Sequence, residues 1–126
     1  MDYSEAENLV KNINTEIRKF PWMDFEVNQY SNSVLEVKGG IDLLAKPNIV
    51  ISFLDVFSVS MPFSWQTETK KDVFLLLEGL EEREMNLHFK VEQGNYWFKF
   101  IPERYQEGFG CYIVARNVEF RLLAET

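Results

Sequence analysis

The chain has 126 residues, of which 46% are hydrophobic and 15% aromatic, a composition that excludes a disordered chain and suits β-structure. This length predicts a single domain over residues 1–126. With 13 lysines and arginines against 20 aspartates and glutamates, the formal net charge is −7, which argues against direct binding of nucleic acid or of anionic membranes and favours a cationic partner.

The cysteine content and the N-terminus indicate the compartment. Cys111 is the only cysteine, so no internal disulfide forms and no thiolate cluster holds zinc. Residues 1–12 are acidic and polar where a secretory signal is basic and then apolar, and no apolar run reaches the ~18 residues of a membrane span. We therefore expect a cytoplasmic protein.

Residues 4–20 carry the pattern of an amphipathic helix. Ser4 and Glu7 fit a capping box, and Pro21 stops the helix. Apolar residues recur at helical spacing while polar residues occupy the other faces, so we expect one stripe to pack on a sheet. The apolar set is Ala6, Leu9, Val10, Ile13, Ile17 and Phe20.

Beyond Pro21 the hydrophobic period changes from nearly four to two, which predicts a β-hairpin. Residues 24–28 and 35–38 alternate apolar and polar side chains, and the Ser-Asn-Ser sequence at 31–33 indicates a turn between them. The short apolar piece at 41–45 fits a strand, a turn of helix or a buried loop.

In the longest alternating run, residues 49–63, every second residue is apolar except Asp55. Fully extended, the run would span roughly 50 Å, well beyond a usual strand of roughly 17–20 Å, so it must bend or break. A bulge at Asp55 would reverse the parity, turn Leu54 and Val56 inward and let the acid reach solvent. The alternative is a buried functional acid. We favour the bulge.

The next segments predict further strands. Residues 72–80 fit both a helix and a buried strand, and their short apolar run with Gly79 favours a strand. Residues 86–92 alternate cleanly, and a Gln-Gly-Asn turn at 93–95 leads into the apolar residues 96–101, which predicts a second hairpin.

The C-terminal quarter predicts an exposed loop over residues 102–110 and a long strand over 111–123, whose inward parity switches around Arg116 and Asn117. Two long strands with such irregularities would form a strongly twisted sheet able to wrap the N-terminal helix. The predicted fold class is α+β, with an N-terminal amphipathic helix packed on a curved, mainly antiparallel β-sheet.

Most catalytic, metal and cofactor sites lack the residues that they need; carboxylates are plentiful, but their spacing argues against a paired-acid glycosidase or a calcium site. His88, the only histidine, lies on the polar side of its predicted strand with no second histidine or cysteine near it, which argues against metal binding and most catalytic triads. Cys111 begins an apolar strand, as a small core residue does. No dinucleotide fingerprint or phosphate loop is present. We expect no enzyme activity, no cofactor and no metal.

Four glutamates, Glu78, Glu81, Glu82 and Glu84, form the densest acidic run in the chain. The run lacks the alternating oxygen ligands and the glycine of a calcium loop. A solvated face explains it most simply, and the functional alternative is a binding surface for a cationic partner.

Two tryptophans are the remaining candidates for partner binding. Trp97 shares its parity with Lys99, so it belongs to the exposed face of its strand unless residues 102–110 cover it. Trp65 stands alone in a polar stretch, residues 65–71. The candidate partner-binding residues are therefore Glu78, Glu81, Glu82, Glu84, Trp65 and Trp97.

The chain resembles small immunity proteins of bacterial polymorphic toxin systems in its amphipathic N-terminal helix and in the order of the segments that follow. The helix ends with residues 20–22, and the later segments are residues 24–27, 53–56 and 112–120. Relatives often carry a histidine before the acid that corresponds to Asp24, where this chain has a methionine, so no polar site is carried over. The resemblance implies a non-enzymatic protein that neutralises a cognate toxin by direct binding. An acidic inhibitor matches the basic groove of a nuclease toxin.

Two other classes of function stay open on the sequence. A β-rich aromatic domain is able to enclose an apolar small molecule, which predicts a large internal pocket. A structural or assembly subunit would instead form a symmetric oligomer through a sheet edge or an aromatic patch.

Overall fold

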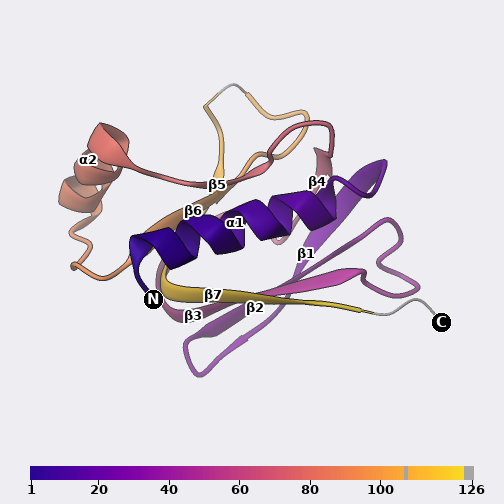
Figure 1. The fold of residues 1–126 in the computed structure, drawn as a ribbon, viewed down its shortest axis with the longest axis horizontal. Helices are drawn as coiled ribbons and strands as arrows, with labels where there is room; N and C mark the ends of the chain where they lie inside the picture. The colour runs from indigo at the N-terminus through magenta and orange to yellow at the C-terminus, as the bar shows by residue number, and fades with distance from the viewer. Residues whose placement is uncertain (107, 124–126) are drawn as a thin grey trace.

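The computed structural model describes residues 1–106 and 108–123. In it a seven-stranded antiparallel sheet curls around helix α1, and a second helix, α2, stands at one end of the molecule (Figure 1). The strand order is β4-β1-β2-β3-β7-β6-β5, which confirms the predicted α+β class. The elements are α1 (Tyr3–Ile17), β1 (Trp22–Ser31), β2 (Val34–Gly40), β3 (Ile49–Ser60), β4 (Ser64–Glu68), β5 (Phe74–Leu76), α2 (Gly79–Phe89), β6 (Tyr96–Phe100) and β7 (Cys111–Leu122).

Helix α1 forms where its apolar spacing predicts, but it begins before the predicted capping box and ends at Ile17, short of Phe20 and Pro21. The Asp2 carboxylate accepts a hydrogen bond from the Glu5 amide at 2.8 Å, so Asp2 is the N-cap in place of Ser4. The buried stripe includes Ala6, Val10 and Ile17, as predicted. Neither described helix is long and apolar enough to cross a membrane.

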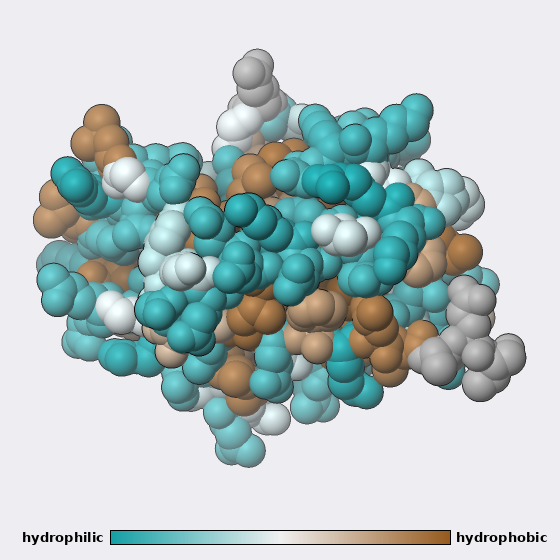
Figure 2. Space-filling view, in the orientation of Figure 1, coloured by the Kyte–Doolittle hydropathy of each residue, from teal (hydrophilic) through white to brown (hydrophobic). Residues whose placement is uncertain are grey.

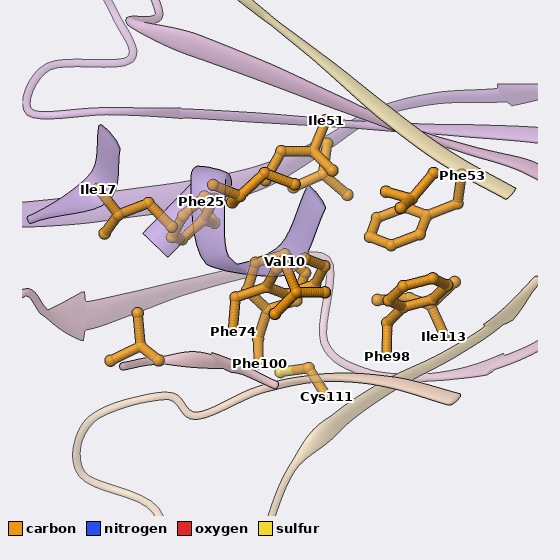
Figure 3. Packing of buried hydrophobic residues seen from close by; sticks show 14 of the residues in the cluster. Val10, Ile17, Phe25, Ile51, Phe53, Phe74, Phe98, Phe100, Cys111 and Ile113 are labelled. Carbon is orange, nitrogen blue, oxygen red and sulfur yellow. The ribbon is translucent and has the colours of Figure 1, made fainter. Parts of the chain in front are cut away.

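The core lies between α1 and the curled sheet, and phenylalanine dominates it. Figure 3 shows Val10 and Ile17 of α1 among the side chains that the strands contribute. The Phe53 ring centroid lies 5.4 Å from that of Phe98, within the usual range for aromatic pairs. The fully buried phenylalanines are Phe25, Phe53, Phe74, Phe98 and Phe100.

The predicted hairpin at the start of the sheet is confirmed as β1 and β2. Its turn residues Asn32 and Ser33 both have positive φ, as the tight turns that suit twisted hairpins require. Residues 41–45 form no helix or strand.

Residues 101–103 make two hydrogen bonds to β4. The Glu103 amide donates to the Gln66 carbonyl at 2.8 Å, and the Thr67 hydroxyl donates to the Ile101 carbonyl at 2.8 Å. Pro102 is consequently buried, so the predicted exposed loop at 102–110 is exposed only in part; its residue 107 lies outside the described residues.

The predicted irregularity of β3 near Asp55 is confirmed, but the register shift comes after that residue. Asp55 is exposed, has a left-handed φ of 54°, and is followed by a one-residue shift in the register with β7 between Val56 and Ser58. The prediction for Leu54 is wrong, because the shift comes after Asp55 and Leu54 keeps the outward side. Val56 is the residue that turns inward and packs against the core.

The parity switch in β7 is also confirmed. Ile113 and Ala115 join the core before Arg116, and Val118 and Phe120 contact it afterwards. The inward face of β7 thus changes phase opposite the bend of β3, where Val56 pairs with Ala115. The two irregular strands lie side by side, as a strongly curled sheet requires.

The predicted second hairpin is wrong. Of residues 72–80 only β5 is strand, and residues 86–92 lie in or just after α2, so β6 pairs with β5 and β7. The run from Leu80 to His88 is rich in good helix formers, and Gly79 and Lys90, both with positive φ, bound the helix. The alternation in this segment is misleading because α2 buries none of its residues.

Candidate functional site

The structure places the four candidate glutamates together at α2. Glu78 is the N-cap residue, Glu81 and Glu82 belong to the first turn, and Glu84 lies two positions after Glu82. Carboxylates at a helix N-terminus are stabilised by the helix dipole. Glu81 and Glu84 are exposed, whereas burial raises the pKa of half-buried Glu82.

Glu78 also connects α2 to α1. Its carboxylate accepts a hydrogen bond from the Tyr3 hydroxyl at 2.6 Å. Burial, followed by this hydrogen bond and the glutamate charge, raises the pKa of Tyr3. Glu78 is thus partly engaged within the molecule, while Glu81 and Glu84 face solvent.

Helix α2 exposes apolar side chains together with these carboxylates. Leu80 is 69% exposed, Leu87 81% and Phe89 51%. Figure 2 shows the hydrophobic side chains over α2 as isolated brown patches among hydrophilic teal at the left of the molecule. Sequence reasoning missed these three residues because it assigned their segment to strands. The helix-forming run of residues 80–88 was the signal that would have identified them.

The two candidate tryptophans are buried, so the alternative of an exposed anchor at Trp97 is wrong. Trp97 lies in a small second core with Leu77 and Val114, and α2 covers it, not residues 102–110. Its indole donates to the Asn86 side chain of α2 at 2.7 Å. Trp65 stacks on Phe25 in the main core, with 5.5 Å between ring centroids. Neither side chain is an exposed anchor, since Trp65 is 6% exposed and Trp97 3%.

The residues considered for chemistry lie apart. His88 is exposed on α2 and contacts Phe89 edge to face. Cys111 is buried in the main core, and burial raises the pKa of its thiol to about 12. Across residues 1–106 and 108–123, no three histidine, cysteine or carboxylate side chains gather where they would hold a metal ion.

Comparison with known proteins adds no assignment: no family model, no curated protein and no solved structure matches this chain.

Proposed function

We propose that this chain is a non-enzymatic binding protein that holds a basic protein partner through α2. The observation that carries the proposal is the combination on one helix of exposed Leu80, Leu87 and Phe89 with the carboxylates of Glu81 and Glu84. Helix α2 covers the second core but buries none of its own residues fully, so Leu80 and Leu87 stay available to another molecule.

The two kinds of side chain on α2 serve different parts of binding. Large apolar residues give short-range affinity once a partner excludes water from them. Carboxylates, with the net charge of −7 behind them, steer a cationic partner and speed association in a salt-dependent way. A helix with both features fits a groove that is apolar at its base and basic at its rim.

The resemblance to immunity proteins supplies the kind of partner. We propose a cognate toxin domain with a basic substrate groove, which α2 occupies and so blocks. The unpaired Cys111 is consistent with a complex that forms in the cytoplasm.

The test uses the polypeptide encoded directly upstream of this chain's gene. Its binding is measured by calorimetry at low and high salt, and its toxicity is measured in cells with and without this chain. We expect a stoichiometric complex, protection of the cells, and binding at least tenfold weaker for the E81K/E82K/E84K variant.

The matched control is D42K/E68K/E119K, which changes net charge equally at exposed acidic residues outside α2. Absence of binding and protection would overturn the proposal. Equal weakening by both variants would show that total charge, not α2, determines affinity, and would overturn the assignment to α2.

A further inference from the structure

The C-terminal half of β3 is an open sheet edge. Residues 57–60 pair with β7 on one side, through registers such as Ser58 with Val114 and Ser60 with Tyr112. On the other side, β2 ends opposite Leu54, and its last link is the Val56 amide donating to the Ser33 carbonyl at 3.0 Å. Within residues 1–106 and 108–123, no second backbone partner reaches 57–60, and all four residues are exposed. Such an edge is a template for pairing with another chain.

Two apolar hollows flank this edge. The core-side hollow, of about 430 Å³, lies between residues 57–59 and the end of the β1–β2 hairpin, and its lining includes Tyr30 and Phe63. The α2-side hollow, of about 260 Å³, lies between residues 58–60 and α2, and its lining includes Phe89 and Trp97. Ser58 and Val59 border both hollows, and neither lining contains a lysine or an arginine.

The register shows how the two hollows relate to the strand. Val59 pairs with Ile113 of the main core, whereas Ser58 pairs with Val114 of the second core, so their side chains point to opposite faces of the sheet. A chain added along this edge alternates its side chains in the same way. One residue would meet the core-side hollow and the next the α2-side hollow. The small Ser58 and Ser60 leave space for large side chains of an added strand.

We propose that residues 57–60 bind, by strand addition, a short apolar segment with basic flanks from a protein partner. Main-chain hydrogen bonds supply affinity, and the two hollows select apolar side chains at consecutive positions. The basic flanks follow from charge, because exposed Asp55 precedes the edge and Glu81 and Glu84 lie on the helix that borders one hollow.

Charge also disfavours a second copy of this chain at the same edge. Pairing of two such edges would bring together two molecules with a net charge of −7 each, whereas a cationic segment is attracted. The identity of the partner as a basic protein rests on the proposed function; the open edge and its hollows are independent of it.

The test uses synthetic peptides with a short run of alternating valine and phenylalanine between paired lysines. Binding to the full chain is measured by fluorescence anisotropy, and the site by amide hydrogen exchange. We expect slower exchange at residues 57–60 and binding at least tenfold weaker for Val59→Lys. The control Gln66→Lys adds the same charge on edge strand β4 and leaves binding within twofold.

A peptide with a central proline and one with glutamate flanks complete the test, and both are expected to bind at least tenfold more weakly. Unchanged exchange at 57–60, equal binding of the glutamate-flanked peptide, or a dimer of the free chain in light scattering overturns the proposal. These peptides do not involve the upstream polypeptide, so failure here is distinguishable from failure of the proposed function. Circular dichroism confirms that Val59→Lys is folded.

Discussion

The indole N–H of Trp97 donates to the side-chain oxygen of Asn86 at 2.7 Å, and this bond connects the second core to α2. Helix α2 is also attached through Met85, which packs partly on that core, through the Phe89 ring, 5.6 Å from that of Trp97, and through Glu78, which accepts from Tyr3. The orientation of the proposed binding helix therefore depends on a polar bond beneath it. That dependence allows α2 to be loosened without touching its exposed face.

Replacing Asn86 with alanine should loosen α2. The buried indole N–H then loses its acceptor, and leaving a buried donor unpaired costs about 1–3 kcal/mol. Urea unfolding measures the loss, and proteolysis within 79–89 measures the local effect. Asn12→Ala, an exposed change on α1, is the control and should stay within ~0.5 kcal/mol. Equal stability of the two variants would show that the Asn86 bond contributes nothing.

Asn14 should be among the most sensitive positions of the chain. It lies on the buried face of α1, where its amide donates to the Phe74 carbonyl at 2.7 Å and its oxygen accepts from the Val73 and Phe74 amides, each at 3.2 Å. Asn14→Leu removes these three bonds together with the bond from the Asn14 amide to the Val10 carbonyl, and leaves backbone groups of residues 73 and 74 unpaired, at about 1–3 kcal/mol for each buried group. Denaturant unfolding against Asn12→Ala measures the loss. A cost no greater than the control's would contradict this account of how β5 is held.

The strands that could be predicted are those whose apolar face packs on the core. The alternation in β1, β2 and the first half of β3 follows from burial on one side, and the interruption at Asp55 was visible because a carboxylate broke a strict pattern. Asn14 was not predicted, because a polar residue on an apolar stripe does not reveal which backbone groups it will meet.

The segment around α2 could not be predicted from alternation. Burial does not impose the alternation of Leu87, Phe89 and Val91, since Leu87 is 81% and Phe89 51% exposed. A pattern that burial does not impose carries no information on secondary structure, and helix propensity then decides the outcome. The acidic run was found, but its exposed apolar neighbours became visible only with the helix.

Substitutions at Asp55 test whether its left-handed backbone conformation or its carboxylate matters for stability. Because its φ of 54° is left-handed, glycine should be tolerated or slightly stabilising there, whereas a β-branched valine should cost about 1–2 kcal/mol. Thermal and urea unfolding of Asp55→Gly and Asp55→Val measure the difference. A large loss of stability with glycine would show instead that the Asp55 carboxylate itself stabilises the fold.

Substitution of Leu87 should weaken partner binding without changing the stability of the fold. Its side chain is 81% exposed, so Leu87→Ser should leave the free energy of unfolding within ~0.5 kcal/mol. If α2 holds the partner, the same change should weaken binding of the upstream polypeptide about tenfold, or ~1.4 kcal/mol. The control is Leu44→Ser, which removes a fully exposed leucine far along the chain from α2. Equal binding by both variants would exclude Leu87 from the interface.

The stability that the buried Cys111 thiol contributes to the main core should depend on pH. Burial raises the pKa of its thiol from 9.0 to about 12, so the folded state holds this proton to higher pH than the unfolded state. Its contribution to stability is complete below pH 9.0 and falls as the pH rises from there towards about 12. We expect the fall in unfolding free energy above pH 9.0 to be smaller in Cys111→Ala, and a thiol reagent to label the native chain only as fast as the core opens. Rapid labelling of the folded protein at neutral pH would show that the thiol is accessible, contrary to its place beside Phe100 in the core.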